Sequence, residues 1–270
     1  MMSDLNIVYW RRDNNNWGDA ISPVIASYMS GGVNTHYIAP EDCTTNVKRY
    51  AVIGSILQAI KSDRTEVWGS GFISKEPKGV CIPKRIHSVR GPLSRRIYTR
   101  MGIKCPEIYG DPALLMPLIY PSAGDEATYD LGIVPHWTEL DDPRVQMLSE
   151  SSRVKVISPL NTAQEMLDNR FINDILSCRK IASSSLHGLI LAHAYGIPAA
   201  RMYLTNSVVG KGFKFKDHMM SVNIPYFESI KVTELTTVNE INRIIDVSIA
   251  PHIDFESIIK SCPFAHNHLT

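Results

Sequence analysis

Residues 180–198, KIASSSLHGLILAHAYGIP, predict a strand followed by a helix, the unit from which α/β folds are built. We expect a short buried strand over Lys180–Ser183, then a turn and helix N-cap formed by three serines, then a helix over Leu186–Tyr195 that ends at a glycine. His187 therefore lies in the first helical turn. There, free backbone N–H groups favour an anion, and an imidazole can exchange protons near neutral pH.

Short runs rich in Ile and Val recur on both sides of this unit, with helical stretches between them. The further runs are Leu5–Trp10, Tyr50–Ile53, Glu66–Trp68, Ile86–Val89, Leu131–Val134, Val154–Ile157 and Ala199–Leu204. Runs that are apolar throughout are typical of strands buried on both faces, as in parallel sheets covered by helices. The chain is therefore expected to be an α/β protein.

The segment 120–129, YPSAGDEATY, is the best candidate for a linker because Pro, Gly, Ser and acidic residues separate two apolar runs there. We expect an N-terminal domain over residues 1–122 and a C-terminal domain over residues 123–270. Helices near Val238–Ile249 and Phe255–Lys260 are expected to pack back toward the junction.

Composition excludes several classes of protein. A formal net charge of +1 without a basic stretch gives no electrostatic footprint for nucleic acid. Five scattered cysteines without a CxxC pair indicate neither zinc nor redox chemistry and fit a reduced cytoplasmic protein. The N-terminal stretch lacks a signal-peptide pattern, and no window is long and apolar enough to span a membrane.

In open α/β sheets, ligands gather beyond the carboxyl ends of the strands. After the first strand comes NNNWGDAISP, where Gly18 permits a close approach and Asp19 is a good N-cap for a helix over residues 20–29. The glycine turn after the second run, at Gly54, can serve a ligand or the fold equally well. At the end of LGIVPHW, His136 is equally suited to ligand contact and to strand termination.

The segment HSVRGPLSRRIYTRMG, residues 87–102, holds a second strong signal. A strand delivers Arg90, Gly91 turns the chain, and Pro92 suits the first position of a helix. A guanidinium at this point can grip a carboxylate or phosphate with two parallel hydrogen bonds. The alternative is a structural ion pair.

Five pieces of the chain, in order, resemble the polysaccharide pyruvyl transferases: NWGDAISP, SVRGPLS, YGDPALLMP, LGIVPHW and SSSLHGLILAHAYGIP. This family moves a pyruvyl group from phosphoenolpyruvate onto a sugar to form a cyclic ketal. The resemblance implies a GT-B-like fold, with two Rossmann-like domains and the active site in the cleft between them. It also implies that His187 is the catalytic acid, that Arg90 binds the donor's anionic groups, and that no metal or organic cofactor takes part.

One position departs from the family pattern, because many members carry an arginine where this chain has Ser185. The donor phosphate then needs other partners, such as the helix N–H groups near Leu186 and the lysines of KGFKFKDH. The predicted substrate-binding residues are Trp17, Gly18, Asp19, His136, Trp137, Ser185, Leu186, Gly188, Lys214 and Lys216.

The expected partners are phosphoenolpyruvate and a saccharide, without nucleic acid. A lipid-linked saccharide would bring the protein to the inner face of the membrane without an integral segment. Trp17 and Trp137 are expected in loops, where they can stack on a sugar or pack a core. Two other functions stay open: a GT-B-type nucleotide-sugar glycosyltransferase, and a non-catalytic carbohydrate-binding partner in polysaccharide assembly.

Overall fold

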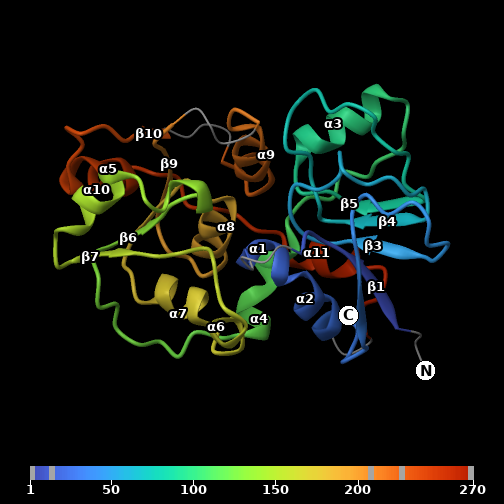
Figure 1. The fold of residues 1–270 in the computed structure, drawn as a ribbon, viewed down its shortest axis with the longest axis horizontal. Coiled ribbons are helices and arrows are strands. Elements are labelled where there is room, and N and C mark those ends of the chain that lie inside the picture. The colour runs from blue at the N-terminus through green and yellow to red at the C-terminus, as the bar shows by residue number, and fades with distance from the viewer. Residues whose placement is uncertain (1–3, 12–15, 206–209, 225–228, 267–270) are drawn as a thin grey trace.

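Two parallel sheets, each of five strands, form the framework of the protein (Figure 1). The computed structural model describes residues 4–11, 16–205, 210–224 and 229–266. The first sheet contains β1 (Leu5–Val8), β2 (Thr35–Ile38), β3 (Arg49–Ala51), β4 (Thr65–Trp68) and β5 (Arg85–Ser88). The second contains β6 (Leu131–Val134), β7 (Val154–Val156), β8 (Ile181–Ser183), β9 (Ala199–Tyr203) and β10 (Ser229–Lys231).

The two sheets share one strand order. It is β2-β1-β3-β4-β5 in the first sheet and, read from the opposite edge, β7-β6-β8-β9-β10 in the second. In each sheet the winding reverses beside its first strand, between β1 and β3 and between β6 and β8. Such switch points are where open α/β sheets bind ligands. The expected α/β class with parallel sheets is confirmed, consistent with two Rossmann-like units in a GT-B-like fold.

Helices cover both faces of each sheet. They are α1 (Trp17–Ala20), α2 (Ser22–Met29), α3 (Pro92–Arg100), α4 (Met116–Ile119), α5 (Pro143–Ser149), α6 (Ala163–Leu167), α7 (Arg170–Leu176), α8 (Leu186–Ala194), α9 (Phe213–Ser221), α10 (Val238–Asp246) and α11 (Phe255–Lys260). Two 3-10 turns, η1 (Pro112–Leu115) and η2 (Trp137–Glu139), complete the described elements.

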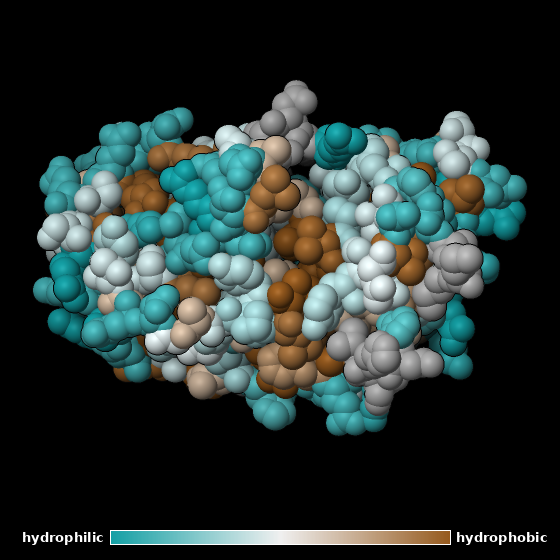
Figure 2. Space-filling model, turned by 90° about the horizontal axis from the view of Figure 1, so that it is seen from below, coloured by the Kyte–Doolittle hydropathy of each residue, from teal (hydrophilic) through white to brown (hydrophobic). Residues whose placement is uncertain are grey.

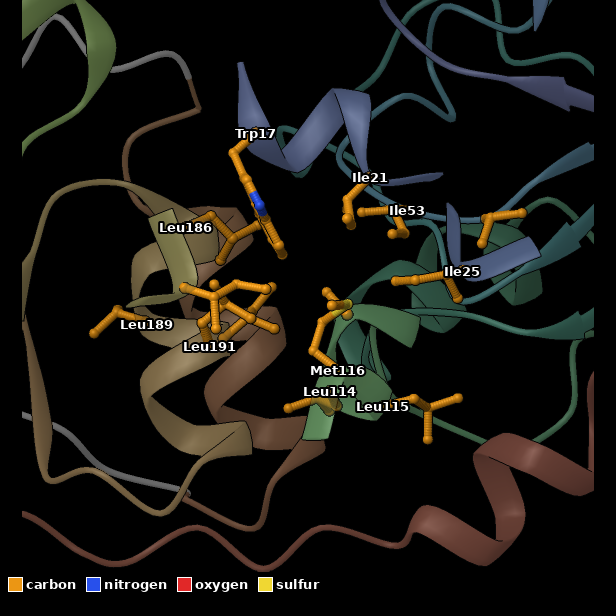
Figure 3. Packing of buried hydrophobic residues seen from close by; sticks show 14 of the residues in the cluster. Trp17, Ile21, Ile25, Ile53, Leu114, Leu115, Met116, Leu186, Leu189 and Leu191 are labelled. Atoms are coloured by element: carbon orange, nitrogen blue, oxygen red, sulfur yellow. The ribbon is translucent and has the colours of Figure 1, made fainter. Parts of the chain in front are cut away.

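One hydrophobic core is shared by the two sheets (Figure 3). Its members include Ile25 of α2, Leu114 of η1, and Leu189 and Leu191 of α8, with η1 in contact with both helices. Each of these side chains is at most 1% exposed, and such burial contributes about 1.5–3 kcal/mol per side chain. Separate clusters line the remaining face of each sheet. The shared core fixes the two halves against one another.

The final helix returns to the first sheet, where the indole Nε1 of Trp68 donates to the carbonyl of Ile258 at 3.0 Å. Residues 121–127 carry no helix or strand, in the segment proposed as the linker. The division into domains at residue 122 stays a prediction.

Two strands were missed by the sequence prediction, β2 and β10. Both are edge strands, and in β2 only Ile38 is buried, so its sequence has no continuous apolar run. The helix predicted over residues 20–29 is in fact two helices, α1 and α2, which meet at Ile21. The N-cap prediction for Asp19 was wrong. Asn16 caps α1 by accepting from the Gly18 N–H at 3.1 Å, and Asp19 lies inside the helix.

Within the described part of the chain, every helix is too short or too polar to cross a membrane. Figure 2 shows the face seen from below, where hydrophobic residues gather near the middle and hydrophilic residues lie on either side. Helices α2 and α4 are linked by the Tyr28 hydroxyl, which donates to the Leu118 carbonyl at 3.0 Å. Val24 and Leu118 on these two helices are each 44% exposed.

Candidate active site

The two switch points face one cleft of about 150 Å³. Residues that follow β1, β3, β6 and β8 line it, because parallel strands present their carboxyl ends at one edge. The lining residues are Trp10, Asn16, Asp19, Gly54, Ser55, Ile56, Ile73, His136, Trp137, Ser185, Leu186, His187 and Lys214. Both halves of the chain therefore contribute walls to a single small site.

His187 lies in the first turn of α8, as predicted, with a side chain 11% exposed. Its Nε2 is 3.8 Å from Oδ2 of Asp111, and no described residue hydrogen bonds to that nitrogen. Ser185 occupies the N-cap position, but its hydroxyl makes no capping hydrogen bond. Ser185 thus leaves the N–H groups at the start of α8 available to an anion.

The imidazole of His187 packs directly on Gly18. A Cβ at Gly18 would lie 1.8 Å from Nδ1 of the ring, so any side chain at this position would displace the histidine. The Trp17 ring approaches from the side, with its centroid 6.2 Å from that of the imidazole. The NWGDA segment therefore shapes the seat of the histidine.

Asp111 is fully buried opposite the histidine. Its Oδ1 accepts from the Ala113 N–H at 3.0 Å and caps η1, and its Oδ2 accepts from the Gly54 N–H at 3.4 Å. This backbone capping is typical of an aspartate before a proline at a turn. The same carboxylate also faces Nε2 of His187, which makes it a candidate to orient the ring.

Lys214 contributes a cation to the cleft wall although its side chain is buried. Burial, together with the positive charges of Arg90 and Arg201, lowers the pKa of Lys214 to about 8. The carboxylates of Asp19 and Glu139 act in the opposite direction. The ammonium form is therefore the main form near neutral pH, and its charge can be matched by an incoming anion.

His136 lines the cleft and caps η2. Burial, with a smaller effect of the Lys214 charge, lowers the pKa of His136 to about 4. Its ring Nδ1 lies 2.7 Å from the Thr138 hydroxyl, and its backbone N–H donates to the Ser184 hydroxyl at 2.8 Å. At neutral pH this ring is uncharged and can exchange hydrogen bonds with a polar ligand.

Arg90 does not reach the cleft, contrary to the direct donor contact expected of it. The guanidinium is fully buried, and it pairs with Asp217 of α9 at 2.9 Å. It also donates to the Phe72 carbonyl at 2.6 Å and to the Ser55 hydroxyl at 2.5 Å. Every nitrogen thus has a protein partner, as in the alternative of a structural ion pair. Ser55 itself lines the cleft, so Arg90 contacts the site through that hydroxyl.

Three further residues predicted to contact substrate lie away from the cleft in this structure. Trp17 is 1% exposed and packs on Phe171, so its ring cannot stack on a sugar. Gly188 is buried against Ser183 and lies outside the cleft. Lys216 is exposed and lines a neighbouring cavity instead.

Gly18 lies against the His187 ring and does not line the cleft. The remaining predicted residues come together at the cleft: Asp19, His136, Trp137, Ser185, Leu186, His187 and Lys214. Sequence reasoning missed Asn16, Ile56 and Ile73. Asn16 carried a signal, since Asn before a predicted helix is a preferred N-cap. The two isoleucines carried none, because apolar residues after strands are common in cores.

Comparisons with known proteins match this region. The model of the polysaccharide pyruvyl transferase family matches residues 83–204, which hold Arg90, Asp111, His136 and His187. Four of the five motifs lie within this range, and the resemblance that they indicate is confirmed there; NWGDAISP lies outside it.

Two curated relatives are similar over longer stretches. The chain is 26% identical over 224 residues to the succinoglycan biosynthesis protein ExoV of Rhizobium meliloti (strain 1021), covering 81% of this chain and 65% of ExoV. It is 29% identical over 152 residues to an uncharacterized protein of Acanthamoeba polyphaga mimivirus, covering 55% of this chain and 51% of that protein. The chain thus spans between half and two thirds of the length of these relatives.

Proposed function

We propose that this protein transfers the pyruvyl group of phosphoenolpyruvate onto two hydroxyls of one sugar residue, forming a ketal in a precursor of a surface polysaccharide or exopolysaccharide. The observation that carries the proposal is His187, seated at the start of α8 in the cleft and facing the buried carboxylate of Asp111. The family match over residues 83–204 supports the class of reaction. The role in succinoglycan biosynthesis given by the name of ExoV supports a saccharide acceptor.

The first step is a proton transfer to the donor. Protonated His187 gives a proton to the methylene carbon of phosphoenolpyruvate, which makes the adjacent carbon electrophilic. A sugar hydroxyl forms a C–O bond to that carbon, and its proton returns to the imidazole. Because Asp111 faces Nε2, we assign the donated proton to Nδ1, with Asp111 accepting a hydrogen bond from Nε2 once the present 3.8 Å separation shortens.

The second step closes the ring. The C–O bond to phosphate breaks, and the phosphate leaves with the bonding electron pair. A second hydroxyl of the same sugar then attacks the same carbon, and its proton leaves with the phosphate. One phosphoenolpyruvate and one diol give one ketal and one inorganic phosphate, so the chemistry requires no metal or organic cofactor.

The remaining groups position the donor. Lys214 and the N–H groups at the start of α8 offer positive charge to its carboxylate or phosphate. Arg90 acts as a positioning residue through the Ser55 hydroxyl. Such alignment lowers the barrier because the reacting groups are held together before reaction.

We place the reaction in the cytoplasm, and a lipid-linked acceptor would bring it to the inner face of the membrane. All five cysteines are free thiols, which fits a reducing compartment.

The test replaces His187 by Gln and measures phosphate release and the mass of the saccharide product with phosphoenolpyruvate as donor. Turnover is expected to fall by roughly 10²–10⁴-fold, the usual contribution of a general acid. The matched control is His36→Gln, an exposed histidine paired with Asp4 outside the cleft, which should retain full activity. Near wild-type turnover in His187→Gln would remove the histidine as the acid.

A thermal-shift titration separates the rival functions. Phosphoenolpyruvate should raise the Tm of a pyruvyl transferase, whereas a nucleoside diphosphate should raise that of a nucleotide-sugar glycosyltransferase. A carbohydrate-binding partner would respond to saccharides without any phosphate release.

A further inference from the structure

A second and larger cavity, of about 630 Å³, adjoins the cleft. It is lined by Ser184, Arg201, Met202, Tyr203, Thr205, Lys211, Gly212, Phe215 and Ser229. Ser184 and Phe215 line this cavity, while their chain neighbours Ser185 and Lys214 line the cleft. The two spaces therefore lie one residue apart in each of two separate segments.

Arg201 is held in a fixed position on the cavity wall. Its Nη1 donates to the Ser229 hydroxyl at 3.2 Å. Its Cζ lies 4.8 Å from the centroid of the Phe215 ring and 5.6 Å from that of Tyr203. The guanidinium also packs on Gly212, where φ is +85° and a Cβ would come within 2.8 Å of Nη1. The fork of donors is thus pre-organised.

The charge of Arg201 is uncompensated by the described residues. Each of the other described arginines that is not exposed pairs with a carboxylate: Arg49 with Asp42, Arg90 with Asp217, Arg95 with Glu107, and Arg144 with Asp142. Arg201 has no such ion pair in the described ranges, and its buried Nε has no hydrogen-bond partner there. A half-buried cation that no described carboxylate pairs with is costly to bury, which indicates that an anion arrives with a ligand.

Other groups around the cavity fit an anionic saccharide. Lys211 is exposed at its edge and adds a second cation. Glu139 is buried next to the cavity lining, and its carboxylate accepts from the hydroxyls of Ser184 and Thr205 at 2.7 and 3.1 Å. Because these hydroxyls separate the carboxylate from the cavity, they reduce its repulsion of an anion and offer oxygen acceptors to sugar hydroxyls.

We propose that this cavity binds the phosphate group of a phosphate-bearing saccharide acceptor, with Arg201 as the main phosphate contact. The inference rests on the proposed function, because it assigns the acceptor end of that reaction. Donor and acceptor both present phosphate, but the cleft of about 150 Å³ suits the small donor, whereas about 630 Å³ suits a sugar phosphate.

The test is calorimetric titration of wild type and Arg201→Gln with glucose, galactose and mannose 1-phosphates, the free sugars, and phosphoenolpyruvate. For at least one sugar phosphate, the Kd should rise by roughly tenfold or more in Arg201→Gln, since hydrogen bonds to charged groups are lost. The Kd of phosphoenolpyruvate should not change. The matched control is Arg96→Gln, which removes one positive charge from an exposed position on α3.

Several outcomes would overturn the proposal. The first is that wild type binds no sugar phosphate, and the second is that both proteins bind it equally. The third is that Arg201→Gln loses affinity for phosphoenolpyruvate alone, which would mean that the cavity binds the donor. If Arg201→Gln does not fold, Lys211→Asn replaces it, because Asn tolerates the positive φ of that position and a threefold loss is expected. Arg201-dependent binding of a sugar phosphate, with no binding of phosphoenolpyruvate, would support this site and contradict the proposed function.

Discussion

The Arg90 and His187 regions both join the two halves of the molecule, yet they differ in how completely their polar groups are satisfied. Arg90 has a protein partner for every nitrogen, and Asp217 accepts in addition from the Leu93 N–H at 2.9 Å. His187 faces Asp111 at 3.8 Å with Nε2 unbonded among the described residues. A saturated buried pair holds a structure together, whereas His187 can still tighten its contact with Asp111 through Nε2 while Nδ1 serves a substrate.

The strongest way to break this comparison is Arg90→Met. Removing the guanidinium leaves the Asp217 carboxylate buried without its ion-pair partner, so the free energy of unfolding should fall by about 3–5 kcal/mol. Urea denaturation measures the change, and Arg96→Gln, at an exposed position on α3, should alter the free energy of unfolding by less than about 0.5 kcal/mol. A variant of unchanged stability with a raised donor KM would show instead that Arg90 contacts the substrate.

Lowering the pH should destabilise the region around Arg90 and Asp217, because a pair of buried histidines lies next to it. Nδ1 of His193 lies 3.0 Å from Nε2 of His218, the residue after Asp217, and both rings are buried. Burial lowers the pKa of His193 to about 4, against about 6.5 in the unfolded chain. The unfolded state therefore binds more protons between these values, so stability is complete above pH 6.5 and is lost as the pH falls toward 4.

From pH 7 to pH 5 the loss from His193 alone should be about 2 kcal/mol. Denaturation at both pH values measures it in wild type and in His193→Gln, where this part of the pH dependence should disappear. Burial also lowers the pKa values of His136 and His218, which add to the wild-type slope, so the difference between the two proteins is the relevant quantity. An equal slope in both would contradict the assignment.

Asp111→Asn gives the smallest expected effect, and it tests the role of the His187 region. Asn keeps an oxygen that can cap η1 through the Ala113 N–H, but it removes the charge opposite Nε2 of His187. We expect kcat to fall about tenfold, as for loss of a group that orients a catalytic residue, while the KM for phosphoenolpyruvate stays constant. A purely structural aspartate would instead lower the Tm and leave kcat per folded molecule unchanged.

The sequence by itself determined the class of fold and the place of the histidine. Continuous apolar runs, such as Leu131–Val134, identify buried parallel strands because a strand covered on both faces has no polar side. The start of α8 was also predictable, since the serines, His187 and the terminal glycine are local signals within one segment.

Only the tertiary structure decided which of the predicted residues meet a ligand. Arg90 finds its carboxylate 127 positions later, in Asp217, and no local pattern links the two. Trp17 is buried by Phe171 of α7, and Asp111 reaches His187 across the junction of the two halves. Secondary structure follows from neighbours in the chain, but whether a charge is satisfied depends on neighbours in space. The folded chain therefore pairs the charge of Arg90 with Asp217 and leaves Nε2 of His187 without a hydrogen bond from a described residue.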